Sequence, residues 1–231
     1  PEFIYKSYEL SENNEEIFIR NNFEISGLSS FAPEWKIRKR IPESITDDRK
    51  LRILVFSLGM VELVSYWKIT CSPNVTVMCG ELNEEQKIWW KRQYFNGLGE
   101  FFYRNSIKSD FESFMTITSA GSEESGVSHE QSLSGCLIPV GGGKDSIVTM
   151  NLLKDMRESS CCYLINYRES IYKEANTAGF TDDKLILSKR TLDKNMLRLN
   201  SQGFLNGHTP FSAIVAFSAV IAAYINGKKY V

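Results

Sequence analysis

The chain of 231 residues carries 27 lysine and arginine residues against 28 aspartate and glutamate residues, so its formal net charge is −1. That balance, without a basic tract, argues against nucleic acid as a partner, and five cysteines without CxxC spacing argue against a disulfide framework or a zinc site. A chain of this length buries a substantial core, and we expect two domains in a protein of a reducing cytoplasm.

Residues 1–118 are predicted to form an α+β N-terminal domain. Alternating, aromatic-rich runs between residues 14 and 40, such as Ile17–Arg20 and Phe23–Ile25, predict antiparallel strands of a small sheet. The first three residues, Pro1-Glu2-Phe3, lack an initiator methionine and resemble a cloning remnant.

Two helices and a strand are expected later in the same region. Apolar positions predict a mostly buried helix at 48–68, and residues 74–78 are predicted to be a strand. Residues 83–103 are predicted to form a second helix, with the first asparagine as its cap and a bend at Gly97 and Gly99.

A stretch rich in serine, glycine and glutamate, residues 119–135, is predicted to be a linker, and His129 within it is expected to be solvated. The remaining residues, 136–231, predict an α/β domain with a parallel sheet covered on both faces, because strands and helices alternate there. The expected strands are 136–140, 161–166 and 184–188, the expected helices are 145–157 and 169–178, and a further helix and a final strand stub follow.

The apolar segment 210–225 is predicted to be a buried core helix, capped by Thr209, with proline in its first turn and Asn226-Gly227 at its end. At roughly 16 residues it is shorter than the ~20 that span a bilayer, so we expect no membrane partner. Residues 228–231 stop as though a strand had just begun, which predicts that this domain is truncated at its C-terminus.

The most informative segment joins the strand at 136–140 to the next helix, with the sequence Val140-Gly141-Gly142-Gly143-Lys144-Asp145-Ser146. Three residues without Cβ let the backbone approach an anion, and the first N–H groups of the helix carry positive partial charge. The Walker A pattern fails because Ile138 stands at its first glycine, and the dinucleotide-binding pattern fails because its last glycine falls on Ser146. Five of six positions match the pyrophosphate-loop (PP-loop) signature Ser-Gly-Gly-x-Asp-Ser/Thr of the ATP pyrophosphatases, with Gly141 in place of the serine.

Each residue of this segment has an expected role in binding ATP and Mg²⁺. Gly141, Gly142 and Gly143 would cradle the phosphates, and Asp145 would hold the metal ion against them. Lys144 would neutralise charge that develops on phosphate, and Ser146 would donate a hydroxyl hydrogen bond. The alternatives are a helix N-cap role for Asp145 and a glycine-rich turn without any ligand for the whole segment.

Two glutamates stand among aromatic residues on the helices of the first region. Glu62 precedes Tyr66-Trp67-Lys68, and Glu100 precedes Tyr103-Arg104-Asn105. Charges in such surroundings are paired or functional, and the structural alternative is a salt bridge from Glu62 to Lys68 or Arg104.

The segment Asn206-Gly207-His208 precedes the last helix and contains one of the two histidines. Imidazole binds phosphate and moves protons near neutral pH, so His208 is a candidate functional residue. The alternative is a surface histidine beside a helix cap.

Four separated motifs occur along the chain in the order Leu58–Leu63 with Tyr66–Lys68, Gly97–Asn105, Val140–Ser146 and Asn206–Pro210. Together they resemble the UDP-N-acetylmuramoyl-L-alanyl-L-glutamate epimerases. The resemblance runs from about residue 51 to the last residue. It implies that residues 136–231 have the adenine-nucleotide α-hydrolase-like fold of PP-loop proteins and that longer members continue beyond them.

The function that the resemblance implies is that of a bacterial cytoplasmic enzyme of peptidoglycan precursor synthesis. Such an enzyme inverts the terminal L-glutamate of the UDP-muramoyl dipeptide to D-glutamate through an acyl-adenylate, with ATP and Mg²⁺, and releases AMP and pyrophosphate. Adenylylation removes the carboxylate charge that opposes loss of the α-proton, so inversion becomes feasible.

The resemblance also suggests roles for individual residues. Lys144 and Asp145 would act in adenylylation, and the candidates for the base that removes the α-proton are Glu100, Glu62, Lys68 and His208. The expected substrate-binding residues are Tyr66, Trp67, Lys68, Arg104, Asn105, Asn206, Gly207 and His208.

Two alternative functions keep the glycine-rich segment. One is an amide-forming or thiolating ATP pyrophosphatase, although Cys161 and Cys162 lie mid-strand, where neither is presented for sulfur transfer. The other is a non-catalytic nucleotide-binding fragment. Nothing in the sequence indicates an oligomeric state.

Overall fold

The computed structural model describes residues 1–40, 43–122, 124, 126–128 and 132–231, so His129 and part of the expected linker lie outside the described residues. Its strands are β1 (Glu2–Glu12), β2 (Glu16–Ile25), β3 (Ser29–Phe31), β4 (Glu34–Arg38), β5 (Asn74–Val77), β6 (Thr116–Ser119), β7 (Leu137–Pro139), β8 (Cys161–Ile165) and β9 (Leu185–Thr191). Its helices are α1 (Arg49–Trp67), α2 (Glu84–Gly97), α3 (Gly99–Arg104), α4 (Lys144–Leu152), α5 (Glu169–Thr177), α6 (Lys194–Ser201) and α7 (Phe211–Tyr224).

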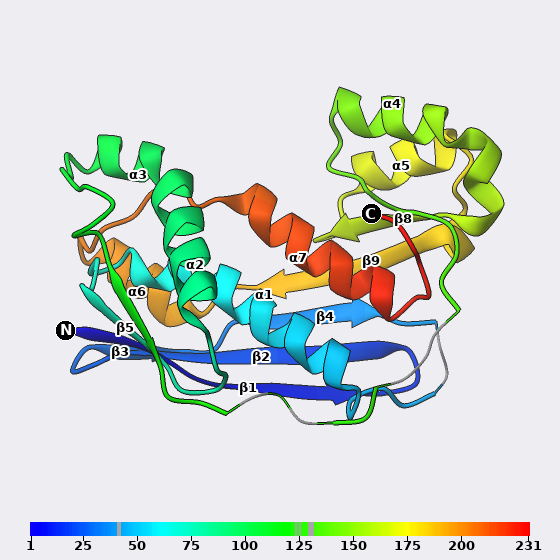
Figure 1. The fold of residues 1–231 in the computed structure, drawn as a ribbon. Helices are drawn as coiled ribbons and strands as arrows, with labels where there is room; N and C mark the ends of the chain where they lie inside the picture. The colour runs from blue at the N-terminus through cyan, green and yellow to red at the C-terminus, as the bar shows by residue number, and fades with distance from the viewer. Residues whose placement is uncertain (41–42, 123, 125, 129–131) are drawn as a thin grey trace.

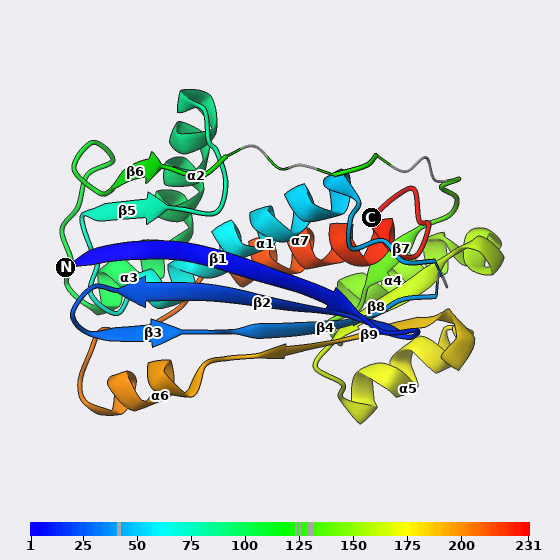
Figure 2. The ribbon, with the colours of Figure 1, turned by 90° about the horizontal axis from the view of Figure 1, so that it is seen from below.

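One mixed sheet runs through the described part of the chain, in the strand order β6-β5-β1-β2-β4-β9-β8-β7, with β3 paired to β2 (Figures 1 and 2). β4 pairs antiparallel with β9, so the strands expected in two separate domains belong to the same sheet. The mixed α/β class is confirmed, and the division at 119–135 stays a prediction. Among the described residues of that stretch, Glu124 contacts Tyr8 of β1 and Arg52 of α1 through its carboxylate.

The first strand is part of the core. Phe3 is fully buried and lies opposite Ile25 of β2 and Val75 of β5. Glu2 and Phe3, which were interpreted as part of a cloning remnant, thus lie in a paired strand, and the origin of this segment stays a prediction. Alternate residues of β1, β2 and β4 face α1, as the period-2 pattern of strands requires.

Helix α1 lies across this face of the sheet and beside α7 (Figure 1). It begins after Asp48, whose carboxylate accepts a hydrogen bond from the Leu51 amide at 2.8 Å, and the expected helix at 48–68 is confirmed. Gly59 is required at the contact with β1, because a Cβ there would lie 1.9 Å from the Tyr5 hydroxyl oxygen.

The strands β7, β8 and β9 are parallel, as predicted, and β8 is covered on both faces, by α7 on one and by α4 and α5 on the other. Cys161 packs in the same cluster as α7, whereas Cys162 faces α4, with its sulfur 3.7 Å from that of Met150. Tyr230 forms a parallel bridge with Cys136 on the other side of β7, which agrees with the predicted strand stub. The order of these strands therefore reverses at β7, and in open α/β sheets ligands bind at the carboxyl ends of the strands beside such a reversal.

Three expected helices differ in their ends. The helix predicted at 145–157 stops at Leu152 and is followed by a 3₁₀ segment, and the helix predicted at 83–103 breaks at Leu98 into α2 and α3. Thr209 does not cap α7, because Pro210 occupies the N-cap position. The body of α7 is a buried core helix, as predicted. None of the described helices is both long and apolar enough to cross a membrane.

Replacing Phe3 by alanine tests whether the first strand contributes to the core. We expect Phe3→Ala to lower the free energy of unfolding by about 3 to 5 kcal/mol, the usual cost of deleting a buried aromatic ring. The control, Leu28→Ala, removes a partly exposed side chain from the turn after β2 and should change stability much less. Equal urea midpoints for both variants would show that Phe3 does not belong to the cooperative core.

Candidate functional site

The glycine loop, defined here as Gly141–Ser146, runs from the carboxyl end of β7 into the first turn of α4. Gly142 has φ +83°, which favours glycine, and a Cβ there would lie 3.1 Å from Ile171. At Gly141 and Gly143 a Cβ would meet no atom within 4 Å, so packing within the protein does not explain these two glycines. The space beside the backbone is open to an approaching ligand.

Within the described part of the chain, the first N–H groups of α4 have no side-chain partner. Gly143 is the N-cap residue and makes no capping hydrogen bond, so it leaves these donors available to an anion. Asp145 is not the N-cap, which rules out its structural alternative; it lies exposed in the first turn, next to the exposed Lys144. The predicted phosphate and metal roles of these side chains stay predictions.

Ser146 is engaged within the protein. Its hydroxyl oxygen lies 2.7 Å from the Gly143 carbonyl oxygen and 2.8 Å from Oε1 of Glu174 on α5. A single hydroxyl hydrogen donates to one of these at a time, so a bond from Ser146 to a phosphate would require this contact to open. No local pattern in the sequence marks Glu174, because its contact with the loop depends on how α5 packs against α4.

A cavity of about 190 Å³, called here the loop cavity, opens at the carboxyl ends of β7 and β8. Gly141 forms part of its wall, and Asn166, Arg168 and Phe211 line it from the end of β8 and the start of α7. Asn166 has φ +53°, a conformation that asparagine tolerates better than most residues, and it turns the chain sharply after β8. The loop cavity thus lies where the reversal of strand order predicts a ligand.

Glu62 is fully buried and pairs with Arg190 of β9, not with Lys68 or Arg104, so both partners named in the structural alternative are wrong. Arg190 Nη2 lies 2.5 Å from Glu62 Oε1, and its Nε lies 3.0 Å from Oε2. The Trp35 indole N–H donates to Oε2 at 3.3 Å. Burial lowers the pKa of Arg190, but the Glu62 charge and hydrogen bonds raise it by more, so the guanidinium is held in its charged form.

Lys68 and the two aromatic residues before it are buried. The Lys68 ammonium donates to the Gly207 carbonyl oxygen at 2.5 Å, and burial, with a smaller effect of the Arg190 charge, lowers its pKa to about 8. The Tyr66 hydroxyl accepts from the Asp193 amide, and the Trp67 indole donates to the Ser72 carbonyl. Tyr66 and Trp67 are therefore core residues, without a surface for the substrate contact predicted for them.

Helix α3 packs against the segment before α7, which brings together two of the predicted motifs. Asn105 donates to the Asn206 carbonyl oxygen at 3.0 Å, and Glu100 pairs with Arg104 at 3.0 Å. His208 Nδ1 lies 4.0 Å from the Glu100 carboxylate, an ion pair only when the imidazole is protonated. These charged side chains are about half exposed or more, so a ligand can reach them.

The structure does not bring this second cluster to the glycine loop. Figures 1 and 2 place α3 and α4 toward opposite ends of the molecule, with the start of α7 between them. Phe211 is the link: it lines the loop cavity, and its ring centroid lies 5.9 Å from the guanidinium carbon of Arg190. The buried Glu62–Arg190 pair thus stands behind the first turn of α7.

None of the five cysteines, all of which lie in the described part of the chain, forms a disulfide. Burial raises the pKa of Cys162 to about 12 and that of Cys71 to about 11, so both thiols are protonated at neutral pH. Both Cys161 and Cys162 are buried, but they are the first two residues of β8 and do not lie mid-strand as predicted. These observations disfavour the thiolating alternative.

The fold and the loop define an α/β domain whose parallel half carries a glycine-rich turn at the switch in strand order. Residues 1–231 match the MurL N-terminal domain, and the chain belongs to this family. No solved structure matches the chain.

Three curated proteins resemble the chain, each described as a UDP-N-acetyl-alpha-D-muramoyl-L-alanyl-L-glutamate epimerase. The protein from a Micromonospora species is 31% identical over 73% of this chain and 37% of its own length. Those from Xanthomonas oryzae and Salinispora tropica are each 28% identical, over 75% and 81% of this chain and 38% and 40% of their own lengths. The matched region is therefore about two fifths of each relative or slightly less.

Removing one partner of the Glu62–Arg190 pair should lower the free energy of unfolding more than replacing both partners by apolar residues. Glu62→Gln leaves the buried guanidinium without its counter-charge, and we expect a loss of about 3 to 5 kcal/mol in unfolding free energy. The double variant Glu62→Leu/Arg190→Met should lose less than the sum of its single variants in a double-mutant cycle. The control Glu24→Gln, which breaks an exposed pair with Lys6, should cost under about 1 kcal/mol. Additive losses from Glu62 and Arg190 would contradict a coupled buried pair.

The lowered pKa of Lys68 predicts a pH-dependent stability. Between pH 8 and the unfolded lysine pKa of about 10.4, the unfolded state binds more protons than the folded state, so rising pH stabilises the fold. Lys68→Met lacks this titration, and the stability of wild type relative to the variant should therefore increase by about 1 to 3 kcal/mol from pH 7 to pH 10.5. Denaturant unfolding at both pH values measures the difference, with the exposed Lys173→Met as control. A difference independent of pH would contradict the buried ammonium.

Proposed function

We propose that this domain is the N-terminal part of an ATP-dependent enzyme that inverts the terminal glutamate of UDP-N-acetylmuramoyl-L-alanyl-L-glutamate. Membership of the MurL N-terminal domain family and the similarity to proteins described as epimerases of this dipeptide support the epimerase role and the dipeptide substrate. We propose a cytoplasmic bacterial enzyme of peptidoglycan precursor synthesis on the same grounds. The ATP-dependent step rests on one observation, the open glycine loop before an uncapped helix at the reversal of strand order.

The proposed reaction has three steps. An oxygen of the glutamate α-carboxylate attacks the α-phosphorus of ATP, and pyrophosphate leaves with the bonding electrons. The α-proton then leaves Cα, and a proton returns on the opposite face, which the lost carboxylate charge makes feasible. Water finally attacks the acyl carbon, and AMP departs.

The chain's own residues suit the first step. The exposed backbone N–H groups at Gly143 and the start of α4 would hold phosphate oxygens, and Lys144 would add a cation beside them. Bound Mg²⁺ would neutralise phosphate charge, and Asp145 is the proposed protein ligand. In the described residues no group of three or more His, Cys, Asp or Glu side chains is placed to hold a metal ion.

Substrate contacts are proposed for the exposed cluster of α3 and the segment before α7. Arg104 would pair with a carboxylate or diphosphate, and Asn105 and His208 would donate hydrogen bonds. The roles of Asn206, Gly207 and Lys68 in this proposal are to shape the segment, since the Asn206 and Gly207 carbonyl oxygens are bonded to Asn105 and Lys68.

The base must act close to the glycine loop, because the α-carbon is bonded directly to the activated carboxyl carbon. Glu62 is fully buried and paired, and Lys68 is bonded to the main chain, so neither meets the substrate in this conformation. Glu100 and His208 are the accessible candidates, and they could act as the base only if α3 approaches α4.

Measuring AMP release together with deuterium incorporation tests adenylylation and epimerisation separately. Full-length protein carrying this domain, incubated with ATP, Mg²⁺ and the UDP-muramoyl dipeptide in deuterated water, should release AMP and place deuterium at the glutamate α-carbon. AMP without deuterium would exclude epimerisation but keep adenylylation, and no AMP would exclude both.

Asp145→Asn should reduce AMP release by about 10²-fold or more, because it removes the proposed metal ligand beside the transferring phosphate. Asp155→Asn, a change at an exposed aspartate of the following 3₁₀ segment, is the matched control and should leave the rate unchanged. Full activity in Asp145→Asn would mean that this carboxylate does not hold the metal.

A further inference from the structure

A second cavity, of about 780 Å³, lies on the sheet face opposite α1 and is called here the β9 cavity. Strands β4 and β9 form its floor, Tyr167 stands on one side, and Leu197 of α6 stands on the other. In Figure 2, β9 runs between α5 and α6. Its volume falls within the roughly 300 to 1,000 Å³ of small-molecule sites.

Two lysines face each other on the floor of this cavity. Lys36 of β4 and Lys189 of β9 are directly opposite in the antiparallel register. Like charges at directly opposite positions repel each other and destabilise the pairing of the two strands. Neither ammonium has a carboxylate within 4.0 Å among the described residues, although Glu16 also lines the cavity. Lys36 lies 5.3 Å from the Phe18 ring centroid, a contact that holds it over the sheet without neutralising it.

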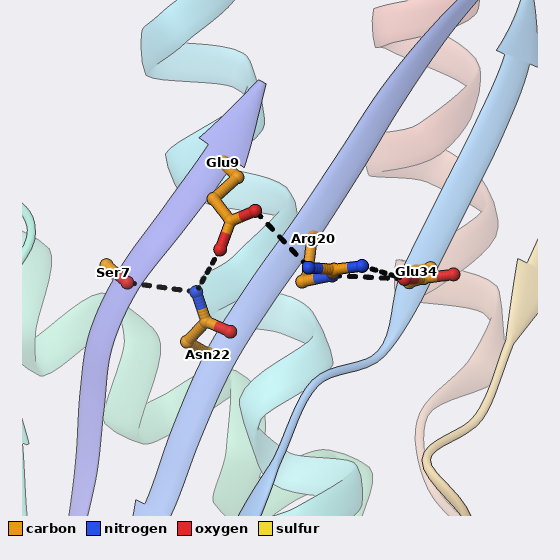
Figure 3. Close-up of polar contacts among 5 residues, drawn as sticks. All are labelled: Ser7, Glu9, Arg20, Asn22 and Glu34. Atoms are coloured by element: carbon orange, nitrogen blue, oxygen red, sulfur yellow. Dashed lines mark hydrogen bonds and ion pairs between the residues drawn. The ribbon is translucent and has the colours of Figure 1, made fainter. Parts of the chain in front are cut away.

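On the same face of the sheet, the cation of the neighbouring strand β2 is paired with carboxylates of the protein. Figure 3 shows Arg20 of β2 between two carboxylates, 2.7 Å from Glu34 and 3.5 Å from Glu9. Asn22 bridges Ser7 and Glu9 by hydrogen bonds of 3.0 and 3.1 Å. Across β1, β2 and the start of β4 the polar groups therefore satisfy one another, whereas the lysine pair leaves two positive charges for an anion from outside.

The β9 cavity adjoins the loop cavity through Asn166, which lines both. Its side-chain oxygen accepts from the Arg190 amide at 2.9 Å, so the residue is fixed between the end of β8 and β9. Tyr167, the next residue, is 56% exposed and offers an aromatic face, and Leu187 and Leu197 add apolar surface. A cavity with two unpaired cations and an aromatic wall matches a diphosphate joined to a flat base.

We infer that the β9 cavity binds the nucleoside diphosphate end of the substrate. Lys36 and Lys189 contact the diphosphate oxygens, and the base lies against Tyr167, while the rest of the substrate passes Asn166 toward the glycine loop. The identification of the nucleoside as uridine rests on the proposed function. The preference for a diphosphate joined to a base rests on the cavity itself.

Calorimetric titration of the protein with UDP tests this inference. We expect Lys36→Gln and Lys189→Gln each to weaken UDP binding about tenfold or more, because each removes a charge-assisted hydrogen bond. Lys6→Gln, which changes a paired lysine on the same face, should leave the affinity unchanged. Without ligand, both cavity variants should melt at the same temperature as wild type or higher, since each relieves the lysine repulsion, and this result separates lost binding from lost folding.

Two further ligands distinguish the source of the anion. Inorganic pyrophosphate should bind more weakly than UDP, and ADP should not bind more tightly than UDP. Equal binding of UDP by wild type and both variants would overturn the inference. So would pyrophosphate binding as tight as that of UDP, or a preference for ADP, if Lys36→Gln or Lys189→Gln weakens that binding, because binding at the glycine loop does not depend on these lysines. Failure of AMP release with lysine-dependent UDP binding intact would instead overturn only the adenylylation step, and Asp145→Asn should leave UDP binding unchanged.

Discussion

The buried pair of Glu62 and Arg190 connects the two halves of the sequence, and the arrangement around the glycine loop depends on it. Glu62 comes from α1, which covers the first strands, and Arg190 comes from β9, the first parallel strand beside them. A fully buried carboxylate requires its counter-charge and hydrogen bonds, so the bidentate contact restricts how β9 lies against α1. Because β9 pairs with β4 on one side and β8 on the other, this restriction extends to the sheet edge at β7.

The buried pair also positions the start of α7, which lines the loop cavity of the candidate site. The Arg190 guanidinium lies between Trp35 and Phe211, with ring distances of 6.0 and 5.9 Å, so the first residue of α7 rests on the charged pair. Just before it, the Gly207 carbonyl oxygen is held by Lys68, and Pro210 packs where only a glycine fits at position 97. The segment that joins the two exposed clusters is therefore fixed by contacts from α1, α2 and β9.

Local signals in the sequence predicted the elements but not their long-range pairing. The capping residues Asp48 and Asn83 mark the starts of α1 and α2, because a cap is a contact within one turn. The glycine loop was also predictable, since its position between a strand and a helix is encoded in consecutive residues. Arg190 gave no such signal: one arginine in a strand is ordinary until the fold places it beside Glu62. The opposed lysines, Lys36 and Lys189, depend on the pairing of β4 with β9, which no local pattern specifies.

The described residues include two kinds of cationic side chain. Some are paired with carboxylates of the protein, and others have no such partner. The whole chain is nearly neutral, so an unpaired cluster of lysines does not follow from composition. Arg20 and Arg190 each bind carboxylates and hold strands or layers together, and their charges are used within the protein. Lys36, Lys189 and Lys144 have no such partner among the described residues, and two of them oppose each other at a cost in stability. Repulsion of this kind favours the binding of an anion. The bound anion offsets the repulsion between the two lysines, which destabilises the free protein.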